Sequence, residues 1–387
     1  MTFSKTFNSL PPLSLYIHIP WCVRKCPYCD FNSHQVRDGI PEDQYVDALL
    51  SDLDEQVESV AGRSLTSLFF GGGTPSLFSP QAIERILNGV KKRLSFDTDI
   101  EITLEANPGT VDEARFTGFR QAGVNRLSMG LQSLQNEKLK ALGRIHDREY
   151  ALRAVDAAIN AGFDNFNVDL MHGLPNQSLA DALSDLKDAL AFQVPHLSWY
   201  QLTIEPNTFF HHQPPTLPED DVLWEIQDKG KEVLQKAGLI QYEISAYARE
   251  GHECVHNRNY WEFGDYLGIG AGAHGKITDL TTQSVMRRWQ VKNPKDYLDP
   301  EKKFTASTNQ LSSSDLKFEF MLNALRLTNG VNASLFTERT GLPLSSLEPQ
   351  LAFAKEKKLL LDRADILCPT ELGQRFLNDV ISLFLPG

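Results

Sequence analysis

The chain has 387 residues, of which 41% are hydrophobic, and a formal net charge of −12. This length suits one large domain with a smaller one, and the apolar content is that of a globular protein. No apolar run approaches the roughly 20 residues that cross a bilayer, and no signal peptide is visible, so we expect no transmembrane segment. Peripheral membrane contact is left open. Because phosphate binding requires a basic surface, the acidic charge without a Lys/Arg block argues against nucleic acid as a partner.

Short apolar strands alternate with helical patterns through the first part of the chain. Residues 1–14 are polar and predict a loose N-terminal arm, and the apolar residues 15–19 predict a first buried strand. Further strands follow, together with helices whose apolar residues recur at three- and four-residue steps. The expected strands are 67–70, 100–104, 126–129, 166–171 and 196–202, and the expected helices include 41–60, 79–94 and 147–161.

Six such units predict an α/β fold, a partial (β/α)6 barrel of the TIM type over residues 15–245. A doubly wound sheet would alternate in the same way, but motifs at the C-terminal ends of the strands favour the barrel. Residues 246–310 are expected to form a segment with a His-containing aromatic motif and then a polar linker over 291–310. Residues 311–387 turn helical again and predict a small, mostly helical, winged-helix-like C-terminal domain.

Three of the five cysteines follow the first predicted strand with the spacing C-x3-C-x2-C: Cys22, Cys26 and Cys29. A structural zinc site needs four ligands, and no fourth Cys or His stands nearby at zinc-like spacing. Thiolates are the normal ligands of a four-iron cluster, and three of them would leave one iron open to a chelating molecule. A zinc knuckle or incidental thiols are the alternatives. Because a cluster needs reduced thiols, we expect a cytoplasmic protein, with Cys254 and Cys368 buried.

Polar and glycine residues stand at or just after the ends of successive predicted strands. Gly71 to Pro75 ends the second strand, where glycines let the backbone approach a ligand closely. Arg144 suits the carboxylate of a bound amino acid, while carboxylates and amides such as Glu105, Gln132 and Asp169 suit ribose hydroxyls. Taken singly, each of these residues is more often a surface or capping residue.

In combination these motifs resemble the radical S-adenosylmethionine (SAM) superfamily, and within it the branch that contains the oxygen-independent coproporphyrinogen III oxidases. The resemblance implies a [4Fe-4S] cluster on Cys22, Cys26 and Cys29, with SAM chelated to the fourth iron. It also implies a set of SAM contacts. These are Tyr16, Tyr28, Gly72, Gly73, Thr74, Glu105, Gln132, Arg144 and Asp169.

Two departures separate the chain from the oxidases of that branch. The oxidases carry a further cysteine two residues after the triad, where this chain has Phe31, and they have a longer N-terminal extension. The stretch from His256 to Trp261 reads H-N-R-N-Y-W and is similar to the haem-binding motif of the branch's haem-chaperone subgroup. The resemblance implies that His256 ligates haem iron. Without it, a lone His among aromatic residues is more often a hydrogen-bonded structural residue.

Two functions therefore compete. The chain resembles a haem chaperone, which would transfer haem to an acceptor haemoprotein such as one of the respiratory chain. The alternative is an oxygen-independent coproporphyrinogen III oxidase, which would decarboxylate its substrate by radical chemistry. Phe31 and the motif that begins at His256 favour the chaperone. Whether SAM is cleaved, and whether the protein is an enzyme at all, stays open.

Overall fold

The structure is a computed structural model that describes residues 5–37 and 39–386. Its main element is a twelve-stranded sheet, in which six parallel strands stand side by side in the order β1-β4-β5-β6-β7-β8. This arrangement confirms the predicted α/β partial barrel. The six strands are β1 (Leu13–Ile19), β4 (Ser64–Gly72), β5 (Ser95–Ala106), β6 (Arg126–Gln132), β7 (Phe166–His172) and β8 (His196–Gln201).

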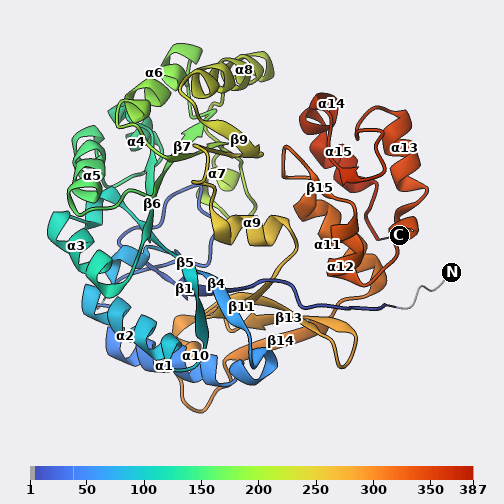
Figure 1. The fold of residues 1–387 in the computed structure, drawn as a ribbon. Coiled ribbons are helices and arrows are strands. Elements are labelled where there is room, and N and C mark those ends of the chain that lie inside the picture. Colours follow the sequence, from blue (N-terminus) through green and yellow to red (C-terminus); the bar gives the residue numbers. More distant parts are fainter. Residues whose placement is uncertain (1–4, 38, 387) are drawn as a thin grey trace.

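Helices cover the convex side of these strands (Figure 1). They are α1 (Glu42–Asp54), α2 (Pro80–Lys91), α3 (Glu113–Ala122), α4 (Asn136–Ala141), α5 (Arg148–Asn160), α6 (Leu179–Leu190) and α8 (Asp220–Lys236). Short 3-10 turns lie at Val57–Val60, Pro75–Leu77 and Pro108–Thr110. Helix α2 starts as its sequence predicts, because the Ser79 side chain accepts a hydrogen bond from the Ala82 N–H and Pro80 holds the first helical position.

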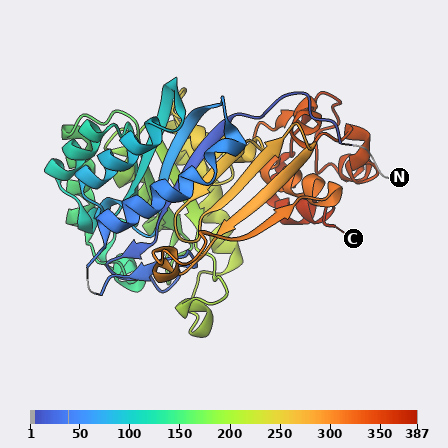
Figure 2. The same cartoon turned by 90° about the horizontal axis from the view of Figure 1, so that it is seen from below.

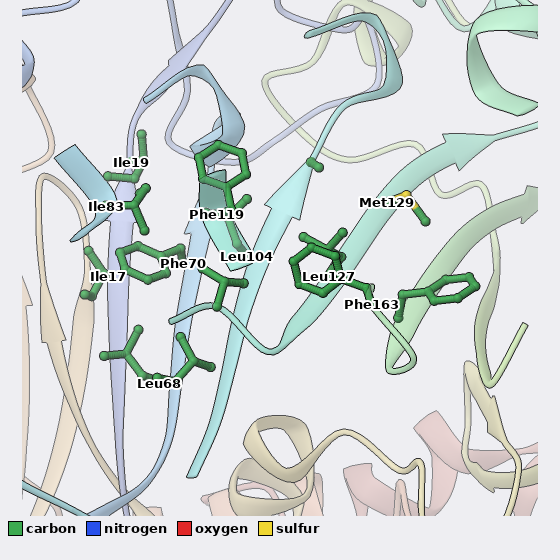
Figure 3. Close-up of a cluster of buried hydrophobic side chains, with 14 of the residues drawn as sticks. Ile17, Ile19, Leu68, Phe70, Ile83, Leu104, Phe119, Leu127, Met129 and Phe163 are labelled. Carbon is green, nitrogen blue, oxygen red and sulfur yellow. The ribbon is translucent and has the colours of Figure 1, made fainter. Parts of the chain in front are cut away.

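The parallel strands turn mainly apolar side chains outward and mainly polar ones inward, since neighbouring residues of a strand point to opposite faces. On β1, Leu15, Ile17 and Ile19 are fully buried in the main core, whereas Tyr16 and His18 alternate with them. Figure 3 shows the apolar layer, where residues of four strands meet helix residues such as Ile83 and Phe119. The hydrophobic core therefore lies between sheet and helices. The concave face carries most of the polar side chains, together with aromatic residues such as Phe69, which packs against Tyr16 and His256.

The sheet continues past the predicted boundary at residue 245. β9 (Ile240–Glu243) and β10 (Ala246–Ala248) form one edge, and β11 (Asp265–Ile269) lies parallel to β1 on the other side. β12 (His274–Asp279), β13 (Ser284–Gln290) and β14 (Thr305–Gln310) then extend the sheet antiparallel, as Figure 2 shows.

The expectation that residues 291–310 form a linker is wrong. They contain α10 (Pro294–Tyr297) and β14. β14 is an outer strand whose residues 306–310 are all exposed, so its sequence carries no apolar alternation from which a strand could be predicted.

The C-terminal part is mostly helical and has its own apolar cluster, which includes Phe320, Phe336 and Val380. Its elements are α11 (Ser313–Ala324), β15 (Val331–Asn332), α12 (Ser334–Thr340), a 3-10 turn (Leu344–Leu347), α13 (Gln350–Glu356), β16 (Ile366–Leu367), α14 (Glu371–Arg375) and α15 (Leu377–Ser382). The same cluster includes Tyr242 and Phe263, so this part packs against the sheet region.

The described part of the N-terminal arm is held in place, although its polar sequence predicts a loose segment. The Lys5 ammonium donates to the Leu311 carbonyl at 2.7 Å, and the Thr6 N–H donates to the Gly341 carbonyl at 2.9 Å. The arm therefore crosses to the C-terminal part before β1 begins at Leu13, two residues earlier than expected. No helix in residues 5–37 and 39–386 is long and apolar enough to span a membrane.

Candidate functional site

The cysteine loop leaves the C-terminal end of β1 and is closed by a small parallel pair, β2 (Trp21–Cys22) and β3 (His34–Gln35). The His34 N–H donates to the Pro20 carbonyl at 2.7 Å, and the Val36 N–H donates to the Cys22 carbonyl at 2.9 Å. These bonds bring both ends of the loop together. The three thiols lie on this closed loop and are partly exposed.

Each thiol has a polar neighbour. The Thr74 hydroxyl donates to the Cys22 sulfur at 3.5 Å, and the Arg144 guanidinium donates to the Cys26 sulfur at 3.7 Å. Burial raises the pKa of the Cys22 thiol, so a neighbouring positive centre is needed to hold it as a thiolate. In the described ranges no three His, Cys, Asp or Glu side chains converge on a single-ion site.

The glycine loop at the end of β4 packs directly on the cysteine loop. Gly72 has a φ of +117°, and a side chain there would meet the His18 ring at 2.6 Å. A side chain on Gly73 would meet the Trp21 carbonyl oxygen at 2.6 Å. Glycine is therefore required at both positions. The Thr74 N–H fixes the contact by donating to the Trp21 carbonyl at 2.8 Å.

Two carboxyl groups lie on the concave face beside the glycine loop. Burial, together with nearby Asp169, raises the pKa of Glu105 to about 8, although the Gly72 N–H donates to it at 3.1 Å. Burial likewise raises the pKa of Asp169, which accepts a hydrogen bond from the Asn167 amide at 2.7 Å. A positively charged or hydroxyl-bearing ligand would relieve this concentration of acidic groups.

Arg144 is a buried cation on the same wall. Its Nη2 donates to the Gly130 carbonyl at 2.6 Å, while its buried Nε–H has no partner among the described residues. Gln132 ends β6 with a φ of +69°, an uncommon conformation for a residue other than glycine, and its side-chain oxygen accepts from the Tyr200 hydroxyl at 2.7 Å. Arg144 and Gln132 both face the same cavity.

This cavity has a volume of about 160 Å³. It is lined by all three cysteines and by most of the SAM contacts that the resemblance implies. These are Cys22, Cys26, Cys29, Tyr28, Gly72, Gly73, Thr74, Glu105, Gln132, Arg144 and Asp169. Tyr200 also lines it, although its sequence context predicts only a strand residue. Its place at the C-terminal end of β8 is the signal that could have identified it.

A larger cavity of about 710 Å³ adjoins the first one. Tyr16 lines this cavity and not the smaller one, whereas Phe31, Gly72 and Glu105 line both. His18, Lys25, Asp30 and Asn32 of the β1 and cysteine-loop region also line it, and the remaining residues come from after residue 245. They include Tyr260, Trp261, Tyr266, His274, Arg287 and Lys292. Sequence reasoning missed His274 and Arg287, because they lie on β12 and β13, which were not expected as strands.

His256 is absent from the lining of both cavities. It lies in helix α9 (Val255–Trp261), which packs on β1 and β4 inside the concave face (Figure 1). The side chain is 1% exposed, and both ring nitrogens are within hydrogen-bond distance of hydroxyls, Nδ1 of Ser67 and Nε2 of Tyr260, each at 2.9 Å. Burial lowers the pKa of His256 to about 3. In this arrangement no ring nitrogen of His256 is available to iron.

Two family models match the chain. The radical SAM superfamily matches residues 16–189, and the HemN C-terminal domain matches residues 311–376.

Full-length relatives extend these matches. The chain is 50% identical to a protein of Haemophilus influenzae called heme chaperone HemW, over 97% of this chain and 98% of the relative. It is equally 50% identical to the Escherichia coli protein of the same name, over 97% of this chain and 99% of the relative. Among solved structures, coproporphyrinogen III oxidase (HemN) from Escherichia coli has a TM-score of 0.82 at 24% identity, covering 97% of this chain and 90% of that chain. That likeness shows the fold, and the two relatives show the family: the chain belongs to the HemW family of radical SAM proteins.

Proposed function

We propose that this protein is a haem chaperone, which binds haem and transfers it to an acceptor haemoprotein in the cytoplasm. It carries a [4Fe-4S] cluster with exchangeable SAM. The observation that carries the proposal is the pair of adjoining cavities. The smaller cavity is lined by the three cysteines. The larger cavity is lined by aromatic and cationic side chains and has room for a bulky, flat ligand. The names of the full-length relatives support haem as the ligand.

The residues of the smaller cavity fit a cluster with SAM. Cys22, Cys26 and Cys29 would each ligate one iron of the cluster, which would leave the fourth iron open to chelation by the amino and carboxylate groups of SAM. Arg144 has an unpartnered buried N–H that suits a carboxylate. The acidic pair Glu105 and Asp169 suits the positive sulfonium and the ribose hydroxyls.

The other SAM contacts that we propose are backbone and aromatic groups. Gly72 and Gly73 line the smaller cavity with their backbone, and the absence of side chains lets them pack directly on His18 and Trp21. Thr74 holds the first cysteine, and Gln132 is fixed by Tyr200. Tyr28 lines the smaller cavity, whereas Tyr16 lines the larger one.

The competing function, decarboxylation of coproporphyrinogen III, is opposed by Phe31. Its exposed side chain lines both cavities at the position where the oxidases have a further cysteine.

The test is a haem titration of the purified protein paired with an anaerobic assay under reducing conditions with SAM. We expect a Soret band that saturates at one haem per chain, transfer of that haem to an apo-haemoprotein, and no protoporphyrinogen IX. Multiple turnovers of coproporphyrinogen III, or the absence of a saturable Soret band, would overturn the proposal.

A further inference from the structure

We propose that the larger cavity is the haem site and that His274 on β12, rather than His256 on α9, is the iron ligand. This inference rests on the proposed haem-binding function and assigns the residues that perform it. It concerns three histidines, because His18 and His274 line the cavity and His256 lies behind its wall.

The ring nitrogens of His18 and His256 are already engaged. His18 lies within hydrogen-bond distance of the Tyr16 hydroxyl through Nδ1, at 3.0 Å, and of the Asn32 carbonyl through Nε2, at 2.8 Å. The exposed fraction of His18 is 5% and that of His256 is 1%. To ligate iron, either ring would have to break a buried hydrogen bond and turn, leaving a buried hydroxyl or carbonyl without its partner.

His274 differs from both. Its ring makes no hydrogen bond to any residue that the structure describes, and the residue is exposed where it lines the cavity. The ring is nevertheless partly desolvated, and this partial burial together with the nearby Arg287 and Lys292 lowers the pKa of His274, which favours the neutral imidazole that binds iron. His274 is therefore the one histidine on this wall, among the described residues, with both ring nitrogens available.

Strand register places the other groups that a porphyrin needs on the face of His274. Residues two apart on a strand share a face, so Lys276 lies beside His274. The pairing of β12 with its neighbours sets Tyr266 and Arg287 opposite Lys276, and Trp289 opposite His274 with ring centroids 5.9 Å apart. One surface of the antiparallel extension thus presents an imidazole, aromatic rings and cations together.

The aromatic side of the cavity comes from α9. Tyr260 and Trp261 both line the cavity, which the helical turn permits although an extended segment would not. Tyr260 packs edge-on against Tyr266 with centroids 4.5 Å apart. His256 holds Tyr260 by its 2.9 Å contact, so its role is to position the aromatic wall. In this assignment the aromatic residues of the H-N-R-N-Y-W motif contact haem, and its histidine does not.

The cations of the cavity suit the two carboxylates of haem unequally. Lys276 is buried and paired with Asp265 at 3.3 Å, and Arg287 is paired with Glu319. Lys292 lines the cavity, is exposed, and makes no salt bridge within residues 5–37 and 39–386. The buried indole N–H of Trp261 also lacks a partner there. Lys292 and Trp261 are the groups that we assign to the propionates.

The test compares the haem spectra of His274→Ala, His274→Cys and His256→Ala in the full-length protein. We expect His274→Ala to shift the Soret maximum and to weaken haem retention at least tenfold, and His274→Cys to show the spectrum of a thiolate ligand. His211→Ala is the matched control, since His211 is exposed on α7 (Phe209–His212) and does not line the cavity. It should match the wild type.

Because His256→Ala removes two buried contacts, Tyr260→Phe is measured beside it. This second variant removes one contact and keeps the ring. Because neither variant removes the proposed iron ligand, we expect both to retain the wild-type Soret maximum, while haem retention falls because the aromatic wall is disturbed. If His274→Ala keeps an unchanged spectrum while the wild type binds haem, the ligand assignment is wrong and the chaperone proposal survives. If the wild type binds no haem, both are wrong.

Discussion

At the scale of single residues, the smaller cavity is dominated by an unbalanced set of buried charges. Glu105 and Asp169 both have a raised pKa because they are desolvated, and Arg144 is a buried cation whose Nε–H has no partner in the described chain. Such groups cost folding free energy unless a ligand satisfies them. This makes the three residues the most direct test of the proposed SAM site.

Arg144→Ala should weaken SAM binding by removing a charge-assisted hydrogen bond to the ligand carboxylate. The expected loss is about 1.5–3 kcal/mol of binding free energy. Isothermal calorimetry on the anaerobically reconstituted protein measures it. Arg153→Ala, on the exposed side of α5, is the control and should bind as the wild type does. Equal affinities for all three proteins would remove Arg144 from the site.

SAM affinity should depend on pH through Glu105. The pKa of this carboxyl is raised to about 8, so it is largely protonated at pH 6. A sulfonium cation favours the carboxylate, so SAM binding releases a proton and tightens as the pH rises towards 8. The gain approaches roughly tenfold per pH unit well below the pKa and disappears above it.

Binding titrations between pH 6 and 9 measure this profile. Glu105→Gln, which cannot ionise, should show a flat profile over that range. A wild-type profile as flat as that of the variant would show that Glu105 does not titrate against the ligand.

At the scale of elements, helix α9 depends on a residue far away in sequence. Its N-cap residue, Cys254, has no side-chain capping bond. Instead the carboxylate of Glu101 on β5 accepts from the Val255 and His256 N–H groups, each at 3.0 Å. The same carboxylate lies 3.7 Å from the Arg126 guanidinium, which is 2% exposed. One buried ion pair therefore fixes the helix that carries the aromatic wall.

Glu101→Gln should lower the free energy of unfolding by about 3 kcal/mol, because it leaves Arg126 as a buried charge without its partner. Urea denaturation of the apo-protein measures the change. Glu84→Gln, an exposed residue of α2, serves as the control. A loss no greater than that of the control would mean that water or another group compensates Arg126.

Tertiary contacts explain which elements could be predicted from sequence. The six parallel strands could be predicted, because their apolar outer faces are covered by helices and their ends carry turn residues. Helix α9 could not, since its capping group comes from residue 101 and its polar residues bond to the sheet. β14 could not, because an exposed outer strand has no apolar face. The accessibility of the His274 ring could not be predicted either, because it depends on which residues the pairing of the strands places around it.

At the scale of the whole molecule, the two cavities lie at the junction between the parallel barrel and its antiparallel extension. Figure 2 shows the extension running from the barrel towards the C-terminal helices. Cys22, Cys26 and Cys29 line only the smaller cavity and His274 only the larger one, while Phe31, Gly72 and Glu105 line both. Cluster and haem are therefore expected to occupy neighbouring but separate sites.

This separation predicts that the cluster can be removed without loss of haem. Replacing Cys22, Cys26 and Cys29 together by Ala should abolish the roughly four irons and four sulfides that reconstitution gives the wild type. Haem retention should change less than threefold, and the Soret maximum should not shift, because no cysteine of the triad lines the larger cavity. Iron, sulfide and Soret titrations of the same samples measure all three quantities.

The control is Cys368→Ala, a substitution at a buried site in the C-terminal part, which should keep both cluster and haem. A triple variant that loses haem along with iron would show that the two sites are one.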